Sequence, residues 1–220
     1  MAGSQPFGID SEAIDTFCRR IKTIKDLDVE IALVIGGGNI FRGLNASRNG
    51  MDRVSADQMG MLATIMNAMT LQERFEAIGV PARVLSAIAV GEFVEPFSRR
   101  RAEEYLDDGR LVILAAGTGN PFFTTDTAAA LRASELKADV VLKATNVDGV
   151  FSDDPIENPE AEYFPALGYL DLVKRDLKVM DLTAVTICRD NKIPIIVFDM
   201  NKPENLKKVV SGEPVGTIIS

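Results

Sequence analysis

Short apolar runs alternate with longer stretches of helical character along most of these 220 residues. The most apolar runs are 29–35, 111–116 and 138–143, and a polar or glycine-rich segment follows each of them. Strands that are apolar along their whole length belong to parallel sheets, where crossover helices cover both faces. The alternation therefore predicts one α/β domain over 1–220 with a mostly parallel sheet.

The same pattern predicts the individual elements. The expected helices span 12–27, 55–78, 99–106, 127–136 and 182–191, with a short one from 203. The expected strands span 29–35, 81–87, 111–116, 138–143, 194–198 and 217–219. Ser11 is the expected cap of the first helix, and 148–162 is expected to be an exposed loop. The long helix carries an apolar face typical of a core or a subunit interface, formed by Met59, Leu62, Ile65, Met66 and Met69.

Composition excludes several classes of function. The chain has no histidine, which removes Ser-His-Asp and Cys-His nucleophile systems and histidine metal sites. A net charge of −8 argues against a nucleic-acid-binding surface but leaves small phosphorylated ligands open. Cys18 and Cys188 form no CxxC motif and are expected to be buried, reduced thiols. No run reaches the roughly 18 apolar residues of a membrane span, so we expect a cytoplasmic protein without a membrane partner.

A glycine turn follows the first apolar run, at the edge of the sheet where α/β proteins bind ligands. Gly36, Gly37 and Gly38 let the backbone turn sharply and bring its N–H groups close to a phosphate. Arg42 lies four residues further on, where its guanidinium can fork onto phosphoryl oxygens. A simple strand-to-helix turn explains the glycines equally well.

A second polar loop, GTGNPFFTTD at 117–126, follows the run 111–116. Its two glycines, three threonines and asparagine suit a ribose, a base edge and a phosphate, and its end lies at a helix start, where N–H groups attract anions. The plainer interpretation is that Thr125 or Asp126 only caps the helix. Capping leaves Phe122 and Phe123 in the loop without a purpose, so we favour a binding site.

A third loop starts at Lys143 and runs through Thr145 and Phe151 to Asp154. Phe151 is placed to stack on a purine, but Asp-Gly and Asp-Asp-Pro sequences are also ordinary turn chemistry. The chain has no G-x-x-x-x-G-K-[ST] motif, and Phe122 stands where a dinucleotide fingerprint would need its last glycine.

Taken together, the loops resemble those of the bacterial uridylate (UMP) kinases of the amino-acid-kinase family. The matching segments are FGID (7–10), VIGGGNIFRG (34–43), DQMGMLATIMN (57–67), GTGNPFFTTD (117–126), ADVVLKATNVDGVF (138–151), LKVMDLTA (177–184) and FDMNKPENL (198–206). The resemblance implies a three-layer αβα sandwich around one central sheet. It also implies a UMP lobe at about 1–120 and an ATP lobe at about 121–220.

The resemblance implies roles for individual residues. UMP would be bound by Gly37, Asp57, Thr118, Gly119, Asn120, Pro121, Phe122, Phe123, Thr124 and Thr125, with Asp57 on the ribose hydroxyls. ATP would be bound by Gly38, Arg42, Thr145, Phe151 and Asp154. Arg42 and Asp126 are the catalytic candidates, while Asp181 faces the site in an unassigned role. The GTP-regulatory region would be Gly3, Ser4, Gln5, Pro6, Phe7 and Gly8.

The resemblance further implies Mg²⁺ carried by ATP, a homohexamer, activation by GTP and inhibition by UTP. In one respect the chain departs from the family, whose members begin with a strand ending in a Lys-Leu-Ser-Gly-Glu turn. Met1 falls just after that segment. Met1 is therefore expected to be an internal methionine taken for the start, or the chain to be truncated, rather than a family member that never had the segment. If the 220 residues are the whole chain, we expect it to lack a strand and a phosphate-binding lysine, to have weak kinase activity and to expose a sheet edge.

Two other functions remain open at this stage. One is a kinase of the same fold for a small acceptor such as carbamate or an amino acid, which Asp57 and the 117–126 loop fit less well. The other is a non-catalytic nucleotide-binding regulatory or storage subunit, which the missing lysine segment keeps open.

Overall fold

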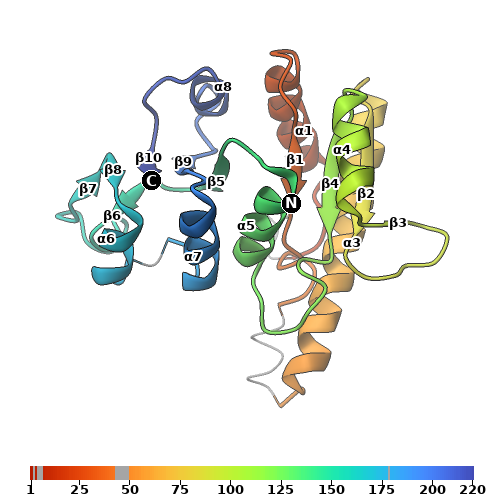
Figure 1. The fold of residues 1–220 in the computed structure, drawn as a ribbon, viewed down its shortest axis with the longest axis horizontal. Coiled ribbons are helices and arrows are strands. Elements are labelled where there is room, and N and C mark those ends of the chain that lie inside the picture. Colours follow the sequence, from red (N-terminus) through yellow and green to blue (C-terminus); the bar gives the residue numbers. More distant parts are fainter. Residues whose placement is uncertain (2, 4–6, 43–49, 178) are drawn as a thin grey trace. The chain divides into compact units, whose positions relative to one another are not determined.

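The computed structural model describes residues 1, 3, 7–42, 50–177 and 179–220. These residues divide into two compact units, which we call the N-terminal unit (Met1–Ala128) and the C-terminal unit (Ala129–Ser220). Each unit has its own four-stranded sheet (Figure 1). The predicted α/β class with mostly parallel strands is confirmed, although the described strands form two separate hydrogen-bonded sheets where one central sheet was expected.

The sheet of the N-terminal unit is parallel throughout. Its strands are β1 (Ala32–Val34), β2 (Ala82–Ser86), β3 (Glu95–Pro96) and β4 (Leu111–Ala115), in the order β1-β4-β2-β3. All five residues of β4 are buried, as its apolar sequence predicts for a central strand. β1 lies at the edge of this sheet and is at most half-buried. It is therefore more exposed than the buried strand predicted at 29–35, and it is also shorter.

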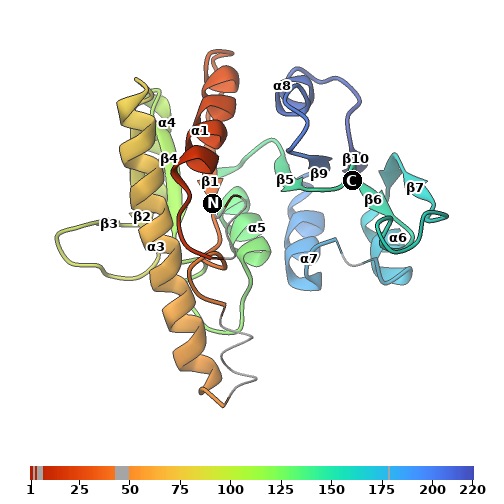
Figure 2. The same ribbon diagram turned by 180° about the vertical axis from the view of Figure 1, so that it is seen from behind.

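Among the described residues, the helices that belong wholly or partly to this unit are α1 (Ser11–Lys25), α3 (Arg53–Ala77), α4 (Arg99–Asp107) and the first turn of α5 (Thr125–Leu136). α3 packs against β2 and β4 with α1 beside it, and α4 lies on the opposite face of the sheet (Figures 1 and 2). The predicted cap of α1 was wrong by one residue. Asp10 caps the helix by accepting hydrogen bonds from the amides of Glu12 and Ala13, at 2.9 and 3.0 Å.

The long helix α3 presents two different faces. Its buried face includes Leu71, Phe75 and the fully buried Asn67. Of the predicted apolar face, only Ile65 is buried, and the other four residues are between 42 and 53% exposed. The methionine-rich stripe is therefore not part of the core of this chain.

The sheet of the C-terminal unit is mixed. Its strands are β5 (Val141–Thr145), β8 (Ala166–Leu167), β9 (Ile195–Asp199) and β10 (Thr217–Ile219), in the order β5-β9-β10-β8, and only the β9–β10 pair is antiparallel. β6 (Val150–Phe151) and β7 (Tyr163–Phe164) form an antiparallel ribbon. The helices are the remainder of α5, α6 (Tyr169–Lys174), α7 (Leu182–Asn191) and α8 (Asn205–Val210).

The elements that the sequence did not predict are all short. They are β3, β6, β7, β8 and α6. β6 lies within the segment 148–162 that was expected to be loop throughout. Two-residue strands have no periodicity to detect, and tertiary pairing alone defines them.

Both cysteines are fully buried and free, as predicted. Burial raises the pKa of the Cys18 thiol to about 12 and that of Cys188 to about 11, so both stay protonated near neutral pH. Among the helices of the described residues, none is both long and apolar enough to cross a bilayer.

Candidate functional site

The glycine turn is pressed against α3. A Cβ atom on Gly37 would lie 2.7 Å from the carbonyl oxygen of Gly60 and 2.8 Å from the Cβ of Ala63, so only glycine fits here. Packing on α3 is therefore sufficient to explain why residue 37 is glycine, in line with the interpretation of residues 36–38 as a simple strand-to-helix turn. A Cβ on Gly38 would meet nothing closer than 3.8 Å, in the Arg42 side chain, and Gly38 is exposed.

Two asparagines lock the turn in place. The buried Asn67 of α3 donates to the Gly36 carbonyl at 2.8 Å and pairs with the side chain of Asn39. Asn39 in turn exchanges two hydrogen bonds with Gly8, at 2.6 and 2.8 Å. Neither asparagine was predicted to have a role, because the contacts span 28 to 31 residues.

Arg42 follows the turn on the exposed side. Its Nε donates to the Gly38 carbonyl at 3.1 Å. A guanidinium carries five N–H donors, so this contact orients the side chain and leaves donors that suit phosphoryl oxygens.

The loop 117–126 is held in an unusual backbone conformation. Gly117 and Gly119 have φ values of +60° and +80°, and a Cβ on Gly119 would lie 2.9 Å from the Ala87 carbonyl oxygen. Phe122 also has a positive φ, of +72°, which a bulky side chain rarely adopts. Phe122 and Phe123 are 63% and 50% exposed, so the core does not account for them.

Asp57 joins α3 to this loop. Its Oδ2 accepts a hydrogen bond from the Phe122 amide at 2.7 Å. Arg53, one turn earlier in α3, donates its Nε to both carboxylate oxygens, at 2.8 and 2.9 Å. The guanidinium carbon of Arg53 also lies 5.5 Å from the centre of the Phe122 ring. Arg53 was missed in the sequence analysis, although its spacing of four residues from Asp57 is that of a helical ion pair.

The two threonines at the end of the loop, Thr124 and Thr125, have different surroundings. Thr124 caps α5, since its Oγ accepts from the amides of Asp126 and Thr127, both at 3.1 Å. The cap is therefore Thr124, whereas Thr125 and Asp126 were the residues considered from the sequence. Thr125 faces the glycine turn, because its Oγ lies 3.4 Å from the position of a Cβ on Gly36. Thr118 and Asn120 hydrogen-bond each other within the loop.

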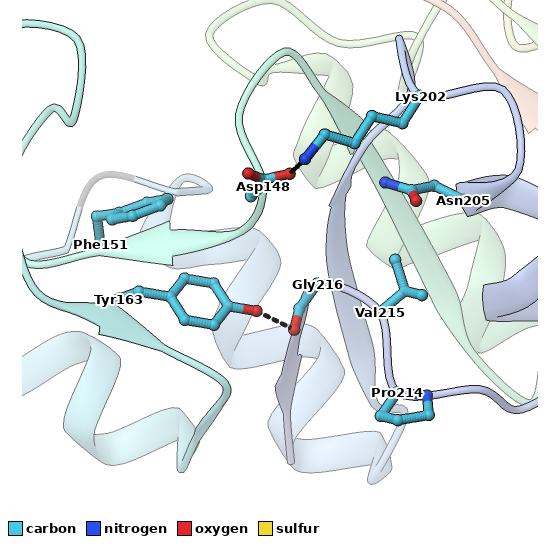
Figure 3. A pocket seen from close by; sticks show the side chains of 8 residues that line it. All are labelled: Asp148, Phe151, Tyr163, Lys202, Asn205, Pro214, Val215 and Gly216. Carbon is cyan, nitrogen blue, oxygen red and sulfur yellow. Dashed lines mark hydrogen bonds and ion pairs between the residues drawn. The ribbon is translucent and has the colours of Figure 1, made fainter.

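The C-terminal unit contains a pocket of about 370 Å³ (Figure 3). Phe151 and Tyr163 line one side, with ring centres 5.2 Å apart, and Lys202 and Asn205 line the other. Asp148, Pro214, Val215 and Gly216 complete the wall. The Tyr163 hydroxyl donates to the Gly216 carbonyl at 2.5 Å, and Lys202 forms an ion pair with Asp148, which raises the pKa of the lysine. Of these residues, only Phe151 was predicted as a ligand contact.

The other predicted residues of this unit have structural partners. The Thr145 hydroxyl shares its one O–H between the carbonyls of Val147 and Phe198, at 2.8 and 3.1 Å. Asp154 is exposed and accepts from the Ile156 amide at 2.9 Å. Asp181 caps α7 by accepting from the Ala184 amide at 2.9 Å, which gives a structural role to a residue that had none assigned.

In the predicted regulatory segment, Gly3, Phe7 and Gly8 are described, while Ser4, Gln5 and Pro6 lie outside the described residues. Phe7 is 73% exposed. Within the described ranges, no three His, Cys, Asp or Glu side chains come together as a metal-binding group.

The N-terminal unit thus brings two of the three predicted loops together beside α3. The glycine turn contacts α3 at Gly60, the loop 117–126 is bound to Asp57, and Gly36 lies opposite Thr125. The third loop belongs to the C-terminal unit, where Phe151 opens onto the pocket.

Comparison with known proteins places the chain in a family. The profile of the amino acid kinase family matches residues 2–199. The chain belongs to the amino acid kinase family. The structure of a UMP kinase from Bacillus anthracis matches with a TM-score of 0.96 and 38% identity, over 100% of this chain and 91% of that one.

Two further solved structures are similar to this chain. A UMP kinase from Ureaplasma parvum matches with a TM-score of 0.90 and 37% identity, over 96% of this chain and 90% of that one. A uridylate kinase from Archaeoglobus fulgidus matches with a TM-score of 0.75 and 35% identity, over 96% and 94% of the two chains. The suspected membership of the family is confirmed, and these likenesses support a kinase.

Proposed function

We propose that this chain is a UMP kinase, which transfers the γ-phosphate of ATP to UMP and releases UDP and ADP. The observation that carries the proposal is the hydrogen bond between the Phe122 amide and Asp57. It joins the polar loop to α3 next to the glycine turn, so that groups suited to a sugar, a base and a phosphate face one place. The likeness to three solved UMP kinases supports the same choice of acceptor.

UMP is assigned to the N-terminal unit. The Asp57 carboxylate accepts hydrogen bonds from the ribose hydroxyls, and the loop from Thr118 to Thr125 surrounds the uracil. Gly37 is assigned to UMP through its backbone, whose position is set by the close packing of the turn on α3. The exposed rings of Phe122 and Phe123 offer apolar surface for a base.

ATP is assigned to Gly38, Arg42, Thr145, Phe151 and Asp154. Phe151 stacks on the adenine in the pocket of Figure 3, whose volume suits one heterocyclic ring system. Thr145 holds the end of β5 in place. Its hydroxyl does not bind ATP, because its O–H is already shared between two backbone carbonyls. Mg²⁺ carried by ATP would supply charge neutralisation at the phosphates, and no protein side chain is assigned to hold it. Asp126, in the first turn of α5, is the second catalytic candidate beside the acceptor loop.

Catalysis then depends on positioning and charge. A phosphate oxygen of UMP attacks the γ-phosphorus in line with the bond to the leaving ADP oxygen. Arg42 and the backbone of the glycine turn stabilise the equatorial oxygens. No general base is needed, since the attacking oxygen is already ionised near neutral pH.

We also propose that the protein forms a homo-oligomer, namely a hexamer. The exposed residues Met59, Leu62, Met66 and Met69 form a stripe with spacings of three, four and three residues along α3. A twofold axis across this stripe would pair it with the same stripe of a second chain, with the two copies of α3 antiparallel. Activation by GTP, inhibition by UTP, a cytoplasmic location and a place in pyrimidine nucleotide biosynthesis also remain proposals.

The test combines binding with turnover. UMP should raise the melting temperature of the protein more than carbamate or amino acids do, and ATP with Mg²⁺ and UMP should yield UDP and ADP. UMP binding without any UDP would favour a non-catalytic nucleotide-binding subunit. Turnover of carbamate or an amino acid in place of UMP would contradict the proposal.

A further inference from the structure

Phe122 adopts its left-handed conformation without support from the core. Its φ is +72° although its ring is 63% exposed. Such a conformation persists in a bulky residue only when neighbouring groups hold it. Two groups do so here, namely the Asp57 carboxylate on the Phe122 amide at 2.7 Å and the Arg53 guanidinium 5.5 Å from the ring centre.

The hydrogen bonds to Asp57 are unevenly distributed over its carboxylate. Among the described residues, Oδ2 accepts from both the Phe122 amide and the Arg53 Nε, whereas Oδ1 accepts from the Arg53 Nε alone. A carboxylate has about two acceptor positions on each oxygen. Oδ1 therefore keeps an acceptor position for a hydroxyl donor, near the plane of the carboxylate, and the existing contacts hold that plane in place.

Arg53 is well placed to maintain this geometry. It lies on the same helix as Asp57, its side chain is 34% exposed and that of Asp57 is 15% exposed. A guanidinium that binds a carboxylate through Nε and lies over an aromatic ring is held at both contacts. A lysine in its place offers a point charge without the planar fork.

We propose that Arg53 is a positioning residue for the nucleoside: it fixes the Asp57 carboxylate and the ring of Phe122 together, so that Oδ1 of Asp57 reads a sugar hydroxyl. This inference rests on the proposed assignment of UMP to the N-terminal unit. It predicts that Arg53 controls how strongly the protein prefers UMP over the same nucleotide lacking a ribose hydroxyl. A hydrogen bond from a hydroxyl to a charged group corresponds to a preference of roughly tenfold or more.

The experiment measures dissociation constants by calorimetry, with UMP, 2′-deoxy-UMP and 3′-deoxy-UMP as the three ligands. The wild-type protein should bind UMP at least about tenfold more tightly than one of the two deoxy analogues. Arg53→Gln should weaken UMP binding and leave that analogue nearly unaffected, so that the preference falls to about two- or threefold. Arg53→Lys should retain part of the preference.

Arg99→Gln is the matched control. Arg99 forms the same kind of ion pair in α4, from its Nε to Glu103 at 2.7 Å and four residues apart, but it has no part in the loop. Its substitution should leave all three dissociation constants unchanged. Circular dichroism checks the fold of each variant, and Arg53→Lys carries the test if Arg53→Gln fails to fold.

The outcomes separate the inference from the proposed function. An equal loss of affinity for all three ligands in both Arg53 variants would show a general structural role and overturn the inference. A wild-type protein that binds UMP without any preference over the deoxy analogues would overturn it too. A wild-type protein that does not bind UMP at all would contradict the proposed function itself.

Discussion

The two candidate binding regions of this protein are built in different ways. In the N-terminal unit, a fully buried asparagine, a glycine packed on helix backbone and a part-buried carboxylate tie the loops to α3. In the C-terminal unit, the pocket is walled by two-residue strands, two aromatic rings and an exposed ion pair between Lys202 and Asp148. The first region depends on buried or part-buried contacts with one helix, and the second on exposed contacts that join segments 53 and 54 residues apart.

This difference bears on how each region responds to substitution. Buried polar contacts are costly to leave unsatisfied, whereas an exposed ion pair contributes little. Changes around α3 should therefore alter catalysis, affinity or stability strongly. Changes in the pocket should affect mainly the ligand that touches the altered side chain.

The largest effect is expected for Arg42→Ala. Loss of a guanidinium that neutralises the transferring phosphoryl group should lower kcat by roughly 10²- to 10³-fold. Steady-state kinetics with varied UMP should show little change in the KM for UMP, because Arg42 is assigned to the transition state. An unchanged kcat would remove Arg42 from that role and leave it as an ordinary exposed arginine.

Asp57→Asn should act mainly on UMP affinity. The asparagine side chain lacks the charge that binds a ribose hydroxyl, and it accepts a weaker hydrogen bond from the Phe122 backbone amide. The KM for UMP should therefore rise roughly 10- to 100-fold. Asp52→Asn is the control, since asparagine caps a helix as well as aspartate does and Asp52 caps α3 through the Ser55 amide. If the KM for UMP were the same in both variants, Asp57 would not be part of the acceptor site.

Gly37→Ala tests how tightly the glycine turn is packed. The added Cβ would meet the Gly60 carbonyl oxygen at 2.7 Å, so the backbone must shift, and the free energy of unfolding should fall by about 1–3 kcal/mol. Gly38→Ala, at the exposed neighbour of Gly37, should change the free energy of unfolding by less than about 0.5 kcal/mol. Urea denaturation measures both, and equal effects would mean that the turn is not specifically packed on α3.

The smallest of these effects is expected in the pocket. Phe151→Ala removes a stacking surface and should raise the KM for ATP by roughly tenfold, since one base on one aromatic ring contributes about 1–3 kcal/mol. The KM for UMP and the stability of the fold should hardly change. Phe93→Ala, at a ring that is 80% exposed, serves as the control. A rise in the KM for UMP instead of ATP would reverse the assignment of the two regions.

Much of the fold could be predicted from the sequence. The strand at 217–219 and the helix at 182–191 have the predicted bounds, and β2, β4, β9, α3 and α4 lie within a few residues of theirs. The strands among them lie in mostly apolar runs and the helices in stretches of nine or more residues, and both features are local properties of the chain. The short strands of the C-terminal unit have no period to detect and were missed.

The candidate site could be predicted only in its outline. The glycines at 36–38 and the loop 117–126 stand out because each follows an apolar strand. Arg53, Asn39 and Asn67 do not stand out, since each is an ordinary polar residue until its partner is known. Ser11 and Thr125 were plausible helix caps, but the backbone direction at each helix start gave the role to Asp10 and Thr124.

The sequence by itself determined the fold class, the absence of histidine chemistry and the loops that carry polar groups at the strand ends. Those properties depend on residue type and on spacing along the chain. Only the tertiary structure decided that the amide of Phe122 meets a carboxylate 65 residues away, and that this carboxylate keeps one oxygen less occupied than the other. Such pairings depend on how helices and loops pack in space, because a hydrogen bond responds to distance and direction and not to separation along the chain.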